Sequence, residues 1–113
     1  ISRESALRRY VALHPAPLAV LFSAMGRVRY VDRGPSFPAT QLEPGDKVGL
    51  LSRRGPPETV TRHGRLDPTT WLRQAAGITL TAQTLSQAGG YAATLLHAEP
   101  IDADMRPRRA PVA

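Results

Sequence analysis

The sequence predicts an α+β domain, built on a mostly antiparallel sheet with two short helices. Three observations predict it: apolar residues at helical spacing near the N-terminus, two hairpin-like pairs of strand segments, and a middle rich in proline and glycine. With 113 residues and no cysteine, the chain fits one domain whose core needs no disulfide. We expect residues 1–99 to form this domain and residues 100–113 to form a poorly packed tail.

The first predicted element is an amphipathic helix over residues 2–14. Ser2 is a suitable N-cap, because its hydroxyl can accept a hydrogen bond from a first-turn N–H, and Glu4 complements the helix dipole. Pro15 and Pro17 end the helix. Its buried stripe is expected to comprise Ala6, Leu7, Tyr10, Val11 and His14.

A hairpin is predicted next. Residues 17–23 are apolar and indicate a central strand, residues 24–26 a turn, and residues 27–32 a second strand. Strict alternation places Val28 and Tyr30 on one face of the second strand, with their neighbours on the other.

The middle of the chain is expected to be irregular. Its prolines and glycines limit regular structure to short pieces, and residues 43–46 read as a type II turn. Residues 58–63 alternate and predict an edge strand.

The C-terminal half begins with a second predicted helix. Asp67 is its cap, Pro68 occupies the first helical position, and Gly77 is expected to end it. Alternating residues 78–87 and the segment 91–99 then predict a second hairpin, turning at an Ala-Gly-Gly sequence.

Composition narrows the functional classes. The net charge is +6, and of fifteen basic residues only Lys47 is not arginine. The arginines are scattered, only six residues are aromatic, and no helix carries a basic stripe, which argues against a nucleic-acid partner. No apolar run reaches the ~20 residues of a membrane span, and no signal peptide is visible. We therefore expect a cytoplasmic protein with no membrane partner.

No catalytic constellation is visible in the sequence. His14, His63 and His97 are far apart, and none belongs to a His-Glu-x-x-His helix. We expect His14 to end the first helix, His63 to be solvated beside a turn, and His97 to lie in the core or an interface. A nucleophile elbow and a phosphate-binding glycine loop are both missing. We expect no catalytic residue, no metal ligand and no cofactor.

A small-ligand pocket is the remaining hypothesis from the residues alone. Aromatic side chains on separate elements either line one concavity beside an arginine or form plain core. The candidate ligand-binding residues are Arg29, Tyr30, Phe37, Trp71 and Tyr91.

Several segments, taken together, resemble the C-terminal region of the ImmA/IrrE family. The opening Ile-Ser-Arg-Glu-Ser-Ala-Leu-Arg-Arg-Tyr-Val resembles the stretch that leaves the peptidase core of those proteins. Residues 17–23, 26–30 and 36–38 are similar to the first hairpin of that region and its continuation, and residues 84–99 to its closing hairpin.

The resemblance implies a GAF-like domain that senses a signal or contacts a repressor. Family members are bacterial zinc metallopeptidases that cleave helix-turn-helix repressors in stress responses and transcription regulation. Their His-Glu-x-x-His lies N-terminal to the region resembled, so no catalytic or zinc-binding residue is carried over to this chain. The implied partners are the peptidase domain of the same protein, a helix-turn-helix repressor and a small-molecule ligand. The chain starts at Ile1 without an initiator methionine, and we expect the native protein to extend upstream.

Two other hypotheses stay open from the sequence. One is a small basic nucleic-acid-associated protein, whose binding would weaken steeply with salt. The other is a stand-alone interaction domain that dimerises through an exposed strand edge.

Overall fold

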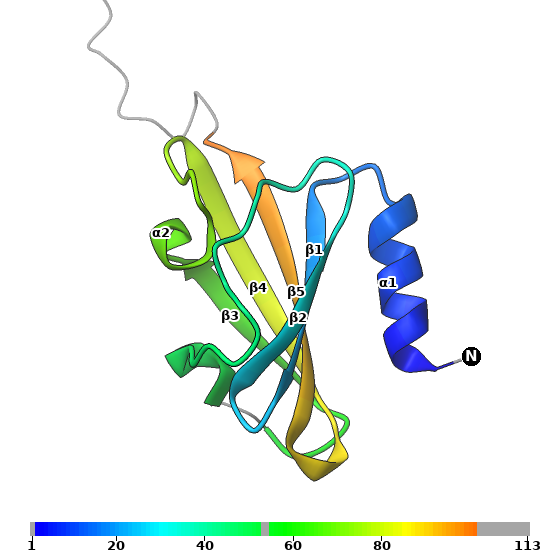
Figure 1. Cartoon of the computed structure of the whole chain (residues 1–113). Helices are drawn as coiled ribbons and strands as arrows, with labels where there is room; N and C mark the ends of the chain where they lie inside the picture. Colours follow the sequence, from blue (N-terminus) through cyan, green and yellow to red (C-terminus); the bar gives the residue numbers. More distant parts are fainter. Residues whose placement is uncertain (1, 53–54, 102–113) are drawn as a thin grey trace, which may run out of the picture.

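The fold is a five-stranded antiparallel sheet with one helix on one face and loops with a short helix on the other (Figure 1). The computed structural model describes residues 2–52 and 55–101. Along the sheet the strand order is β2-β1-β5-β4-β3. This arrangement confirms the predicted α+β class. The elements are α1 (Arg3–Leu13), β1 (Leu18–Ala24), β2 (Arg27–Arg33), η1 (Gly49–Ser52), β3 (Val60–Leu66), α2 (Pro68–Trp71), β4 (Ile78–Ser86), η2 (Ala88–Gly90) and β5 (Tyr91–Pro100).

Helix α1 begins as the sequence predicts. The Ser2 hydroxyl accepts a hydrogen bond from the Ser5 backbone N–H at 3.1 Å. The predicted buried stripe is only partly correct, because Val11 is fully buried while Leu7 is half-buried and Tyr10 is exposed. The helix therefore contacts the sheet along a narrow line.

The first hairpin forms as expected, but the predicted faces of β2 are wrong. Its turn has positive φ at both Met25 and Gly26, the geometry of a type I′ turn. The pairing register shifts between Phe22 and Ser23, and this bulge carries one extra residue on β2. Val28 consequently packs on one face of the sheet and Tyr30 on the other.

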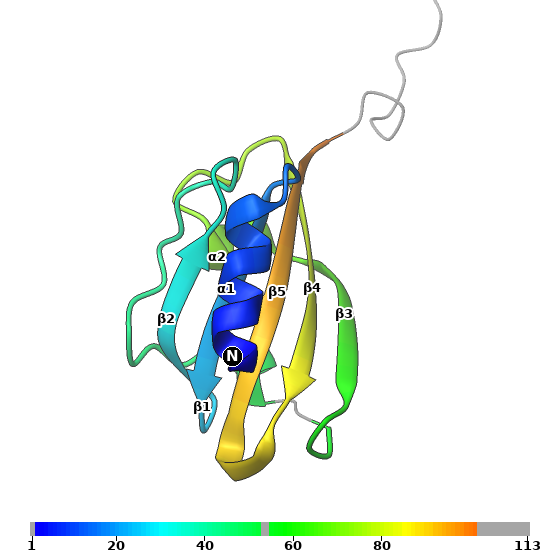
Figure 2. The same cartoon turned by 90° about the vertical axis from the view of Figure 1, so that its right-hand side faces the viewer.

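Two hydrophobic clusters occupy the two faces of the sheet. The larger lies under residues 34–52 and α2, where Phe37, Leu51 and Trp71 are buried against the strands. The smaller lies under α1 and includes Val11. Figure 2 shows α1 in front of the β1–β5 side of the sheet, while β4 and β3 stand clear of it. One face is thus fully covered and the other only in part.

The second helix is shorter than predicted. Asp67 caps it through the Thr69 N–H at 3.0 Å, but α2 ends at Trp71 rather than near Gly77. Leu72 instead forms a β-bridge with Thr40. Backbone pairing with the chain that crosses this face therefore stops the helix.

The edge strand predicted at residues 58–63 forms as β3, but it begins at Val60 and ends at Leu66, at one edge of the sheet. β5 runs through Pro100, one residue beyond the predicted domain limit, and residues 102–113 of the predicted tail lie outside the described residues. In the described ranges, 2–52 and 55–101, no helix is long and apolar enough to cross a membrane.

Candidate functional site

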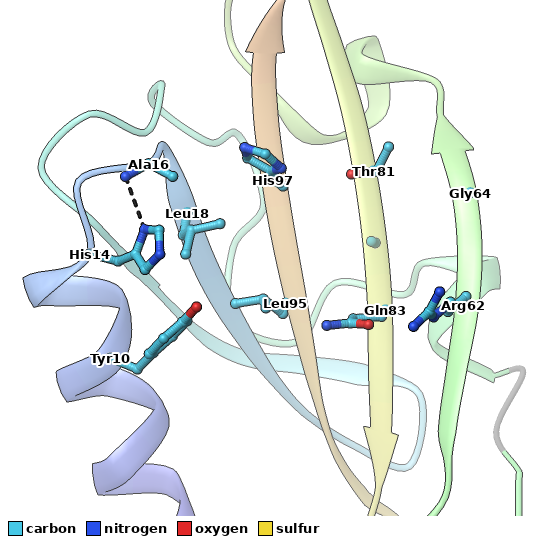
Figure 3. A pocket seen from close by; sticks show the side chains of 11 residues that line it. Tyr10, His14, Ala16, Leu18, Arg62, Gly64, Thr81, Gln83, Leu95 and His97 are labelled. Carbon is cyan, nitrogen blue, oxygen red and sulfur yellow. Dashed lines mark hydrogen bonds between the residues drawn. The ribbon is translucent and has the colours of Figure 1, made fainter.

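A groove of about 450 Å³ lies between α1 and β3, with β4 and β5 as its floor (Figure 3). Tyr10 and His14 form the wall on the α1 side, and Arg62 on β3 forms the opposite wall. Leu95 and Gln83 lie between them. The volume falls in the range of small-ligand pockets, roughly 300–1,000 Å³.

The groove exists because one helix is too narrow to cover a five-stranded face. α1 packs against β1 and β2, and the Arg8–Asp32 ion pair holds it on that side at 2.8 Å. Strand β4 alternates, so Leu80 faces the larger core while Thr81 and Gln83 face the groove. Polar side chains on this half of the face are consistent with its exposure to water.

Cross-strand register orders the floor into rows of increasing polarity. Val60 pairs with Leu85, which pairs with Ala93, and this row is apolar. The next row on this face joins Arg62 to Gln83 and Gln83 to Leu95. A third row pairs Thr81 with His97. The groove is therefore apolar at one end and polar at the other.

The apolar end has a hollow of its own, of about 190 Å³. Leu7, Val20, Val60, Leu85 and Ala93 line it, together with Gln83 and Leu95, which it shares with the larger groove. Beside this end, an Arg3–Glu58 ion pair joins the first turn of α1 to the segment that precedes β3. The two hollows therefore adjoin each other on the α1 side of the sheet, with Gln83 and Leu95 at their boundary.

His14 presents a hydrogen-bond donor at the polar end. The Ala16 backbone N–H donates to His14 Nδ1 at 3.0 Å, so Nδ1 carries no proton. The neutral ring then carries its proton on Nε2, which makes Nε2 a donor. The tautomer is fixed by the chain reversal at Pro15 immediately after α1.

The remaining polar groups of the groove add more donors than acceptors. Within residues 2–52 and 55–101, Arg62 forms no ion pair with an acidic side chain. His97 Nε2 lies 3.3 Å from Glu99 Oε1, so Glu99 already has a partner. The Gln83 amide and the Arg62 guanidinium contribute further N–H groups. Such a lining suits a ligand that carries hydrogen-bond acceptors or negative charge.

No group in the described part of the chain suggests a metal centre. Among residues 2–52 and 55–101, no cluster of three or more His, Cys, Asp or Glu side chains could hold a metal ion. The side chains that line the groove can bind and orient a ligand through hydrogen bonds and apolar contact.

The five candidate ligand residues predicted from the sequence lie on opposite faces of the sheet. Phe37 and Trp71 are each 3% exposed and belong to the larger core. Arg29 lies over the rings of Tyr30 and Tyr91 on the α1 side, at 5.6 and 5.4 Å from the ring centroids. The sheet separates the two groups, so these five residues do not line one cavity.

The arginine–tyrosine cluster instead anchors α1. The Tyr30 hydroxyl donates to the Glu4 carboxylate, and Arg29 Nη1 lies 3.3 Å from Glu4 Oε2. These contacts lower the pKa of Glu4, the Tyr30 hydrogen bond most of all. Burial, followed by the same hydrogen bond, raises the pKa of Tyr30. The β2 bulge brings Arg29 and Tyr30 to the same face and makes this cluster possible.

The prediction that His63 is a solvated side chain beside a turn differs from the structure. It is half-buried, and its Nε2 lies 2.8 Å from Thr84 Oγ1, which in turn lies 2.8 Å from Thr94 Oγ1. Both threonines are at most 2% exposed. This chain of polar groups connects β3, β4 and β5 on the face away from α1.

Many of the arginines are engaged within the fold. Arg3, Arg8 and Arg29 form ion pairs with carboxylates, and others donate to backbone oxygens, as Arg27 does to Gly45 at 3.0 Å and Arg33 to Phe37 at 3.1 Å. These contacts spread the positive charge over separate loops and strands.

Sequence reasoning missed most residues of the groove. One signal was present: Thr79, Thr81 and Gln83 alternate with apolar residues on β4, which indicates a partly solvated face. A second was that the sequence predicts only two short helices beside five strand segments. Together they indicate a half-open sheet, although they do not say which residues from other elements join it.

The chain was compared with family models, curated proteins and solved structures. No family model, curated protein or solved structure matches the chain.

Proposed function

We propose that this chain is a regulatory domain that binds a small-molecule signal in the groove between α1 and β3. The observation that carries the proposal is a half-covered sheet face, whose groove joins an apolar end to a donor-rich end. A sheet face left open in this way exposes apolar area, which a bound ligand would remove from water.

The attachment of α1 gives such a domain a means of signalling. The helix forms one wall of the groove, and only Val11 of its residues is fully buried. A ligand that contacts both α1 and the sheet would stabilise the docked helix by mass action. The proposed output is therefore a change in the docking of the N-terminal helix.

The wider setting follows from the resemblance and is part of the proposal. In an ImmA/IrrE-type protein, α1 would connect this domain to the peptidase domain that acts on a helix-turn-helix repressor. A His-Glu-x-x-His sequence encoded upstream of Ile1 would support this setting, and an unrelated upstream domain would contradict it.

The other two hypotheses receive less support. Many arginines are engaged by carboxylates and carbonyls rather than gathered in one stripe. The β3 edge carries a register shift between Arg62 and Gly64, and bulges and charged residues are devices that discourage edge-to-edge pairing. Neither observation favours a nucleic-acid or strand-edge partner.

A fragment screen read by amide NMR spectra tests the proposed function. Compounds that bind should shift the amide signals of Gln83, Leu95 and His97, and leave those of Phe37 and Leu51 in place. Thr81→Trp, which fills the floor of the groove, should abolish the shifts. Thr79→Trp, on the same strand face but outside the groove, is the matched control and should keep them. A screen in which no compound perturbs the groove would overturn the proposal.

A further inference from the structure

We infer that the ligand of this groove is a small amphipathic carboxylate, with its acid group near Arg62 and its apolar chain along the row of Val60 and Leu85. The inference rests on the proposed function, because it assumes that the groove is a ligand site. It goes further in assigning the chemical class of the ligand and its orientation.

The acid end is assigned by charge and donors. Arg62 has no acidic partner within the described ranges, and its planar guanidinium matches the two oxygens of a carboxylate. His14, on the opposite wall, adds an Nε2 donor to the same groove, with its tautomer fixed by the contact with Ala16. Among the described residues that line the groove none is acidic, and Glu99, just outside it, lies 3.3 Å from His97. A cationic ligand would meet the Arg62 guanidinium without a counter-charge.

The apolar end is assigned by the composition of the smaller hollow. Six of its seven lining residues are leucine, valine or alanine, from α1, β1, β3, β4 and β5, and the seventh is Gln83. Val60 is 58% exposed, although it is a large apolar side chain on the groove face. A bound hydrocarbon chain would cover it and remove apolar area from water.

The length of the ligand follows from the strand spacing. Arg62 pairs with Gln83 on β4, and Leu85 lies two residues further along that strand, or about 7 Å away at about 3.3 Å per residue. The larger groove is open to solvent on one side, so a flexible chain can enter from there. An extended hexanoate or octanoate chain with its acid group at Arg62 spans this distance and decanoate reaches past Leu85, whereas butyrate does not reach Leu85.

Calorimetric titration with a homologous series tests the inference. The probes are butyrate, hexanoate, octanoate and decanoate, with decan-1-ol and decyltrimethylammonium as neutral and cationic comparisons, all below their aggregation concentrations. We expect affinity to rise about fourfold per buried methylene up to the length of the groove. Decanoate should bind at least tenfold more tightly than decan-1-ol and still more tightly than the cation.

Two variants assign the two ends of the ligand. Arg62→Gln should weaken decanoate binding at least tenfold, while Arg9→Gln, which removes the same charge from an exposed helix position, should leave it within twofold. Val60→Thr keeps the size of the side chain and should weaken decanoate but not butyrate. An amide NMR spectrum of each variant without ligand that matches the spectrum of the unsubstituted protein shows that the variant is folded.

The outcomes separate this inference from the proposed function. Equal binding of decanol and decanoate, or an Arg62→Gln variant with unaltered affinity, overturns the inference. Binding of an acidic peptide or of another compound class in the groove, with no binding of the acids, also overturns it and leaves the proposed function standing. If neither the acids nor any screened compound perturbs the groove, both are overturned.

Discussion

The hydroxyl of Tyr30 on β2 donates a hydrogen bond to the carboxylate of Glu4 in the first turn of α1. With Arg29 beside it, this contact draws α1 toward the β2 edge of the sheet. The opposite flank of the helix, with Leu7 and Tyr10, is left facing β4 and β3. The contact that docks the helix therefore also determines where the groove lies.

The Glu4 contact should make stability depend on pH. Tyr30 and Arg29 lower the pKa of Glu4 in the folded state. The contribution of Glu4 to the stability of the fold is therefore complete above the unfolded pKa of about 4.3, and it is lost as the pH falls through the lower folded pKa. Glu4→Gln should lower the free energy of unfolding by about 1 kcal/mol at pH 7, a value that allows for the exposure of the Glu4 side chain, and by less at pH 3. Urea unfolding of both proteins at the two pH values measures this. A cost that stays constant with pH would contradict the assignment.

Val11 should be the main apolar anchor of α1. It is 1% exposed, whereas Leu13 two residues later is 72% exposed. Val11→Ala should lower the free energy of unfolding by about 2 kcal/mol, because it opens a cavity under the helix. Leu13→Ala is the matched control and should change it by less than about 0.5 kcal/mol. Chemical denaturation gives both values, and similar costs for the two would show that α1 is not held at Val11.

Gly34 should be irreplaceable by alanine. A Cβ at this position would lie 2.7 Å from the Val11 carbonyl oxygen and 2.8 Å from that of Leu18, and both are backbone atoms that cannot move away cheaply. Gly34→Ala should therefore destabilise the fold by about 1–3 kcal/mol. Gly49→Ala meets nothing within 4 Å and should be close to neutral. Thermal unfolding of the two variants distinguishes them, and equal melting temperatures would refute the close approach.

The turn between β1 and β2 should accept a stabilising change. Met25 has φ 53°, a left-handed conformation that a methionine adopts at a cost, and Gly26 follows with φ 79°. Met25→Asn creates the Asn-Gly pair that type I′ turns favour, and should add about 0.5–1 kcal/mol. Gly26→Ala should have the opposite sign. A neutral or destabilising Met25→Asn would indicate that the turn is not strained.

Elements fixed by local chemistry could be predicted from the sequence. The Ser2 and Asp67 caps form as their side chains dictate, and the hairpin turns fall where glycine permits positive φ. The end of α2 could not be predicted, because it is fixed by a distant segment. The Gln41 N–H donates to the Trp71 carbonyl at 3.0 Å, which takes the chain out of the helix.

The site was harder to predict than the fold for the same physical reason. His14, Arg62 and His97 come from the end of a helix and two strands that are not sequence neighbours. Only the strand order, with β5 and β4 between α1 and β3, brings them to one groove. The β2 bulge, which moves Tyr30 to the α1 face, likewise has no clear signal in the residues that form it.

Intermolecular NOEs from bound decanoate test most directly whether the groove beside α1 is the ligand site. The chain protons should show NOEs to the methyl groups of Leu7, Leu85 and Leu95, which line the groove. NOEs to Leu51 and Leu72, which lie in the core on the other face, would contradict the proposed site.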